Sequence, residues 1–203
     1  MRIVVAKEPL RRILRWTRRV FLAVAVLLLG YCGFVLGDAW VFQKRESRNL
    51  ERRLREERAA ASTLPQAPPA AVTDGLIGRI EIPRLELSVV VAEGVDKTTL
   101  RRAAGHIPGT GLPGQPGNVG IAGHRDTFFR PLRNIRRHDI ITLTTLRGEY
   151  RYRVVSTRVV SPDTVSVLDP GGEEILTLVT CHPFYFVGSA PNRFIVRAER
   201  VAG

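Results

Sequence analysis

The sequence predicts a mainly β domain: a closed or nearly closed β-barrel of about eight strands with short helical insertions, preceded by one transmembrane helix. Three observations lead there. The chain has one long apolar stretch near its N-terminus, an Ala- and Pro-rich segment after it, and then short alternating runs broken by Gly and Pro. Its 203 residues fit one ordinary domain plus accessory segments. A barrel removes exposed strand edges, but a two-sheet sandwich fits the same pattern.

The apolar stretch Val20–Gly37 contains no charged residue and is close to the roughly 20 residues that a helix needs to cross hydrocarbon. Trp16 and Trp40 bracket it as interfacial aromatics would, and arginines crowd its N-terminal side. A cleaved signal peptide would have a shorter apolar region and a small-residue cleavage site, which "GDAWVF" does not offer. We therefore expect an uncleaved anchor in the cell membrane, with a cytoplasmic N-terminus and the folded domain outside.

The segment after the anchor is dense in charge and in good helix formers as far as Arg58, and predicts a solvated stalk helix with Leu50 and Leu54 on one face. Residues 59–73 suit a semi-rigid spacer. The predicted organisation is 1–19 basic cytoplasmic N-terminus, 20–37 anchor, 38–74 stalk and linker, and 75–203 folded domain.

Within the domain, the elements follow in order. "GRIEIP" and "LSVVVAEG" predict two strands, "TTLRRAAG" a short helix opened by a Thr cap, and "NVGIAG" a strand that runs into a loop. "DIITLTTLRGEYRYRVVSTRVV" alternates on both sides of Arg147-Gly148 and predicts a hairpin. "EEILTLVTC" and "RFIVRAERV" predict the last two long strands.

The net charge of +12 suggests a nucleic-acid or membrane partner. No helix-turn-helix, zinc-finger or RNP-like pattern accompanies it. We therefore expect a membrane partner and no nucleic acid.

The two cysteines lie in different parts of the chain, Cys32 inside the predicted anchor and Cys181 at the end of a predicted strand. Cys181 is thus a free thiol, either a small buried hydrophobe or a nucleophile. A nucleophilic thiol needs a base or a positive field nearby. His124 ends one predicted strand and Arg193 begins another, so the three side chains can converge at one rim of a barrel.

The residues around Cys181, His124 and Arg193 resemble those of the sortases. "TLVTC" matches their T-L-x-T-C signature, and their catalytic His and Arg correspond to His124 and Arg193. "GHIPGT", "GNVGIAGHRDTFFRPL" and "TLVTCHPFYFVGSAPNRFIVRAE" resemble class D sortases in particular, over about residues 76–200. One departure is His138, which stands before Asp139 where glycine is expected.

The resemblance implies a cysteine transpeptidase that cleaves an LPXTG-like signal after its threonine. Cys181 would form the thioacyl enzyme, His124 would move the proton, and Arg193 would donate to substrate and oxyanion. The acceptor would be an amine from cell-wall peptide or a surface protein. The scheme needs no metal or organic cofactor, although calcium modulation through the acidic loop at 161–172 stays open.

Four further observations concern residues near the predicted site. Thr180, next to the nucleophile, is a candidate for orienting substrate or Arg193, and His106 for lining the substrate groove. His182 should face away from Cys181, because neighbouring strand residues point to opposite faces. No ligand pair has the spacing of a zinc site.

Two other functions fit the same residues. The thioacyl enzyme would be resolved by water in a cysteine endopeptidase. A non-catalytic anchored barrel that binds peptide would have no reason for a reactive Cys181.

Overall fold

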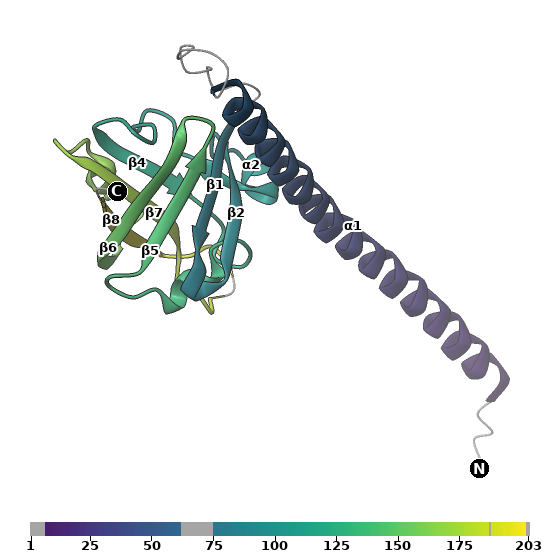
Figure 1. The fold of residues 1–203 in the computed structure, drawn as a ribbon. Helices are drawn as coiled ribbons and strands as arrows, with labels where there is room; N and C mark the ends of the chain where they lie inside the picture. The colour runs from purple at the N-terminus through teal and green to yellow at the C-terminus, as the bar shows by residue number, and fades with distance from the viewer. Residues whose placement is uncertain (1–6, 62–74, 187, 202–203) are drawn as a thin grey trace. The chain divides into compact units, whose positions relative to one another are not determined.

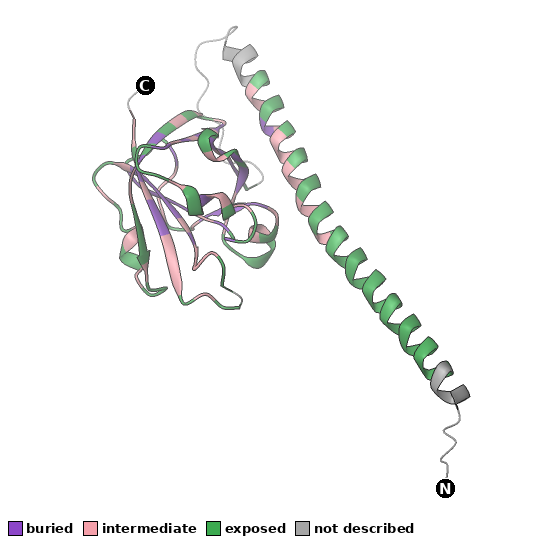
Figure 2. Ribbon diagram, turned by 90° about the horizontal axis from the view of Figure 1, so that it is seen from below, coloured by how far each residue is buried: buried purple, intermediate pink, exposed green. Residues whose placement is uncertain are grey.

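The computed structural model of the chain describes residues 7–61, 75–186 and 188–201. Contacts divide the chain into two compact units, Met1–Trp40 and Val41–Gly203. The helix α1 (Lys7–Ala61) runs through the boundary between them. In the first unit its apolar side chains are exposed, as the green colour of Figure 2 shows, and α1 is the one helix in the described residues that is long and apolar enough to cross a membrane.

The second unit holds a closed eight-stranded barrel, which confirms the predicted fold class and excludes the sandwich (Figure 1). Around the barrel the strands follow the order β1-β2-β3-β4-β7-β8-β6-β5, and β5 closes the ring by pairing with β1. The strands are β1 (Leu76–Ile82), β2 (Leu87–Glu93), β3 (Ala104–His106), β4 (Gly117–Ala122), β5 (Ile140–Thr145), β6 (Gly148–Val160), β7 (Glu174–His182) and β8 (Asn192–Arg200).

Two details differ from the sequence-based expectation. The short helix α2 (Lys97–Arg102) begins after Asp96, whose carboxylate accepts hydrogen bonds from the amides of Thr98 and Thr99, so the predicted Thr cap is wrong. The helix also ends earlier than predicted, because the residues after it form β3, parallel to β2. Three short 3-10 helices complete the connections, namely η1 (Pro83–Leu85), η2 (Arg130–Asn134) and η3 (Val165–Leu168).

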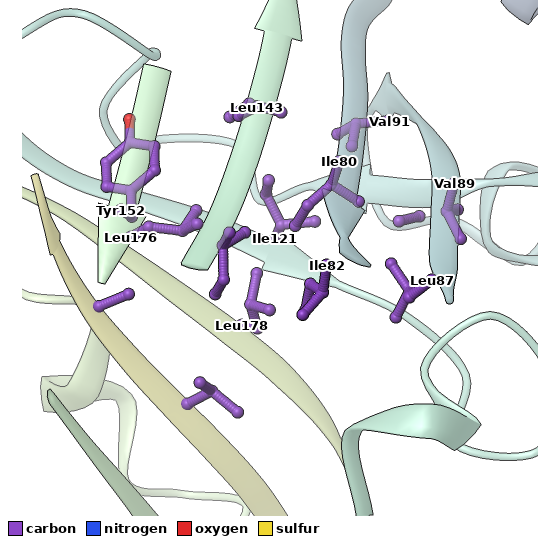
Figure 3. Packing of buried hydrophobic residues seen from close by; sticks show 14 of the residues in the cluster. Ile80, Ile82, Leu87, Val89, Val91, Ile121, Leu143, Tyr152, Leu176 and Leu178 are labelled. Carbon is purple, nitrogen blue, oxygen red and sulfur yellow. The ribbon is translucent and has the colours of Figure 1, made fainter. Parts of the chain in front are cut away.

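The core fills the inside of the barrel with alternate residues of its strands (Figure 3). Ile80 and Ile82 of β1 and Leu176 and Leu178 of β7 are fully buried. Residues between them on β7, such as Thr177, therefore point to the outer face of the barrel wall. This alternation decides which side chains of β7 are available to a site on the outer face.

The C-terminal part of α1 packs on the barrel within the second unit. Leu50 is fully buried against Leu76 and Val90, with Leu54 beside them. The side chain of Gln43 accepts from the amide of Val90 at 2.9 Å and donates to the carbonyl of Arg102. The predicted helical face of Leu50 and Leu54 is thus real, but the helix is not solvated all round there.

The turn before β5 is held by an ion pair. Arg84 donates to both oxygens of Asp139, at 2.5 and 2.6 Å, and to the carbonyl of Asn134. These hydrogen bonds lower the pKa of Asp139, so the carboxylate stays ionised and also accepts from the amide of Arg136. The turn residue before it, His138, has a φ of 73°.

A φ of 73° is a left-handed conformation that favours glycine, so His138→Gly is expected to raise the free energy of unfolding by about 0.5–1 kcal/mol. Thermal or denaturant unfolding of the two proteins measures it. A lower unfolding midpoint for the glycine variant would contradict the conformational account, because the exposed His138 side chain would then be contributing contacts that outweigh its strained backbone.

Candidate active site

Cys181 and Arg193 lie directly opposite each other on neighbouring antiparallel strands. Cys181 is the residue before the last of β7, and its partner in the register with β8 is Arg193. Residues opposed in this way have side chains on the same face of the sheet. Both are half-buried, so the thiol and the guanidinium share a partly covered rim of the barrel.

His124 reaches the same rim from the other side of β7. The strands β4 and β7 pair in parallel as far as Ala122 and Val179. The pairing then continues through the amide of Gly123, which donates to the carbonyl of Val179 at 3.1 Å. His124 and Cys181 each lie two residues beyond the last register pair, so both residues stand at the same end of the barrel, and His124 is exposed there.

Thr180 connects β7 to the backbone just before His124. Its hydroxyl is buried and donates to the carbonyl of Gly123 at 2.7 Å. Because Gly123 precedes His124, this bond ties the residue before the thiol to the residue before the imidazole. The predicted contact of Thr180 with substrate stays a prediction; in the structure its hydroxyl faces the protein.

Arg193 is held by the first residue of β8 and by the segment that precedes it. Its Nη1 donates to the carbonyl of Asn192 at 3.0 Å and to that of Ala190 at 3.3 Å. These bonds use one nitrogen of a planar fork that has five N–H donors. The orientation of the guanidinium is therefore set by the backbone.

Arg125 is a residue of the site that the sequence did not single out. Its guanidinium is buried and donates to three carbonyls of the β7–β8 segment, those of Pro183 at 2.7 Å, Phe186 at 2.5 Å and Gly188 at 3.2 Å. Arg125 thus ties the His124 loop to the segment between Cys181 and Arg193. In the sequence it looks like any arginine in a polar loop, because all three acceptors are backbone atoms.

Asn118 fastens the segment that joins β6 to β7 over the outer face of the barrel. Its buried amide donates to the carbonyls of Val167 at 3.0 Å and Asp169 at 3.3 Å, and its Oδ1 accepts from Thr177 at 2.7 Å. The helix η3 therefore lies above β4 and β7. No sequence pattern singles out Asn118, since a polar side chain in a strand is usually solvated.

His106 and His182 have their rings engaged with other groups of the protein. His106 is buried, with Nδ1 2.9 Å from a carboxylate oxygen of Glu93 and Nε2 2.9 Å from the carbonyl of Gly111. Both ring nitrogens therefore have partners within the protein. The predicted role of His106 in a substrate groove stays a prediction. His182 stacks on Phe194 and meets the edge of Phe184, on the opposite face from Cys181, as the alternation predicts.

Glu174, which follows the acidic loop at 161–172, is bound by other residues of the domain. Glu174 accepts hydrogen bonds from the hydroxyl of Tyr152 and from the amide of Gly114, and pairs with Arg200 at 3.3 Å. Burial and the bond to Glu174 raise the pKa of Tyr152, which keeps the phenol a donor. No group of three or more His, Cys, Asp or Glu that could hold a metal ion occurs in the described part of the chain.

Comparison with known proteins identifies the family to which the chain belongs. Residues 80–201 match the Sortase domain family model. The chain is 31% identical to Sortase D of Bacillus subtilis (strain 168) over 188 residues, 89% of this chain and 95% of the relative. It is 26% identical to Sortase A of Bacillus anthracis over 205 residues, 91% of this chain and 96% of that protein.

A solved structure agrees with this comparison. The Clostridium perfringens Sortase D5 transpeptidase superposes with a TM-score of 0.65 at 28% identity, covering 80% of this chain and 99% of that one. The sequence match, the shared barrel and the strand ends that meet at its rim lead to one conclusion: the chain belongs to the sortase family and is a cysteine transpeptidase.

Proposed function

We propose that the protein is a membrane-anchored transpeptidase that cleaves an LPXTG-like sorting signal after its threonine and joins the acyl fragment to an amine. Sortases attach proteins to the cell wall, and here the acceptor is an amine of cell-wall peptide or of a surface protein. The observation that carries the proposal is the register that puts Cys181 opposite Arg193 and beside the His124 strand end.

In this proposal Cys181 attacks the threonine carbonyl as a thiolate and forms a tetrahedral intermediate. When the C–N bond breaks, His124 gives its proton to the departing amine, and a thioester remains on Cys181. The incoming amine attacks the thioester, His124 takes its proton, and the thiolate leaves. Arg193 donates to the oxyanion in both steps, a role that suits a fixed, permanently charged fork.

The proposed placement puts residues 1–19 in the cytoplasm, 20–37 in the membrane and 75–203 outside, with 38–74 as stalk and linker. Its support is the exposed apolar part of α1 together with the arginines that precede it. Part of the stalk packs on the barrel through Leu50. The folded unit therefore begins before residue 75, at about the point where the second compact unit starts.

The acceptor is tested by incubating the full chain, in a non-ionic detergent, with an LPXTG-like peptide and either triglycine or hydroxylamine. We expect faster release of the C-terminal fragment with amine present and an acyl product that carries the amine. Mass spectrometry distinguishes the two acyl products. A carboxylic acid as the only acyl product at every amine concentration would make the protein an endopeptidase instead, with water as acceptor.

A further inference from the structure

A polar cavity lies on the outer face of the barrel, below the segment that Asn118 fastens. Its volume is about 140 Å³. We call it the arginine pocket. Its walls come from β6, β7, β8 and the β6–β7 segment, and its lining residues are Ser156, Arg158, Val160, Thr164, Ser166, Val167, Thr177, Ile195 and Arg197.

The charge of the arginine pocket is positive. Arg158 and Arg197 line it together with hydroxyl groups, and its lining includes no acidic residue. Neither guanidinium forms an ion pair with a carboxylate in the part of the chain that the structure describes. Two cations and several hydroxyl donors around one cavity favour a carboxylate as the ligand. The cavity is several times the roughly 30 Å³ that one water occupies in the liquid, which leaves room for such a group.

The pocket lies on the same face as the thiol. Thr177 is paired with Arg197 and Cys181 with Arg193, four residues further along both strands. Four residues of β-strand span roughly 13 Å. An extended peptide whose threonine carbonyl is at Cys181, and which runs back along β7, covers the same distance with the four residues before that threonine. For an L-P-X-T signal, the fourth of these residues is the one immediately before the leucine.

The acyl side of the substrate is the part that has to stay bound. After the first step the residues before the threonine remain attached to Cys181, while the departing amine must make way for the acceptor. The arginine pocket is covered by the β6–β7 segment, which would hinder the exchange of an incoming acceptor. The pocket is therefore better suited to the acyl part of the substrate, which stays attached to Cys181. Resting on the proposed function, we propose that Arg158 and Arg197 select sorting signals with an acidic residue immediately before the leucine.

The test compares three peptides, Glu-, Gln- and Lys-Leu-Pro-Ala-Thr-Gly, with the full chain in non-ionic detergent. For the wild type, kcat/KM is expected to be about tenfold higher with Glu than with Lys, as two partly exposed ion pairs would give. In the Arg158→Gln/Arg197→Gln variant this ratio falls close to one. In Arg158→Glu the new carboxylate offsets the charge of Arg197, so the ratio also falls close to one. Added salt lowers the wild-type ratio, because partly exposed pairs are screened.

Arg151→Gln is the matched control, since it removes one positive charge from an exposed arginine of the same strand β6 outside the pocket. Its Glu-to-Lys ratio should equal that of the wild type. The proposal is overturned if the wild type shows no preference, or if the preference survives in the double variant.

A binding measurement separates this proposal from the proposed function. Fluorescence anisotropy with labelled peptides and the Cys181→Ala chain needs no chemistry. Tighter binding of the Glu peptide that depends on Arg158 and Arg197 supports the pocket even if no peptide is cleaved. Equal binding of all three peptides contradicts it even if all three are cleaved.

Discussion

Cys181→Ala is expected to lower transpeptidation by roughly 10⁴-fold or more, as removal of a catalytic nucleophile does in hydrolases. Alanine has no atom that can form the acyl bond, so neither the first nor the second step can proceed. Cys181 is half-buried at the end of β7, and a smaller side chain there leaves the register with β8 intact. The rate of C-terminal fragment release from an LPXTG-like peptide measures the effect.

The chain supplies a matched control for this variant. Cys32→Ala removes the other thiol, which is exposed on α1 in the first compact unit. Its rate should equal that of the wild type, and both variants should keep the wild-type thermal transition. Turnover that survives Cys181→Ala, or that is lost with Cys32→Ala, would contradict the assignment of the nucleophile.

Arg193→Lys is expected to lower kcat/KM by roughly 10²–10³-fold, the usual effect of removing one oxyanion donor. Lysine keeps the positive charge but lacks the planar fork. It also cannot reproduce the geometry in which Nη1 bonds the carbonyls of Ala190 and Asn192 while other N–H groups point elsewhere. We therefore expect geometry to matter more than charge at this position.

Steady-state kinetics with one peptide measures the loss, and Arg151→Lys on β6 serves as the control for an arginine outside the site. If Arg193→Lys retained nearly full activity while Arg193→Gln lost it, charge alone would suffice. The oriented-donor role would then be wrong.

Local patterns in the sequence were enough to predict most of the fold. Each long strand alternates between core and outer face, and Val20–Gly37 is too apolar for a solvated helix. Closure was predicted from the need to remove exposed strand edges, and a sandwich stayed open as the alternative. No local pattern encodes the pairs that close the ring, such as Ile80 with Leu143. The strand β3 was missed because its three residues are too short for an alternation and follow a helix directly.

The site divides along similar lines. Cys181, His124 and Arg193 were predicted as catalytic residues because each stands at a strand end, where neighbouring strands bring side chains together, and their catalytic roles stay predictions. Arg125 was missed because its acceptors are backbone carbonyls 58 to 63 positions away. Asn118 was missed because its role depends on the carbonyls of Val167 and Asp169. Their position above Asn118 cannot be read from the sequence.

The central claim, a thioacyl bond at Cys181, has a direct test in the intact mass of the full chain. The protein is mixed with an LPXTG-like peptide and quenched in acid within one turnover. The account predicts a mass increase equal to the acyl fragment ending in threonine, removed by hydroxylamine and absent from Cys181→Ala. An adduct that persists in Cys181→Ala, or peptide cleavage by the wild type with no adduct at any quench time, would contradict it.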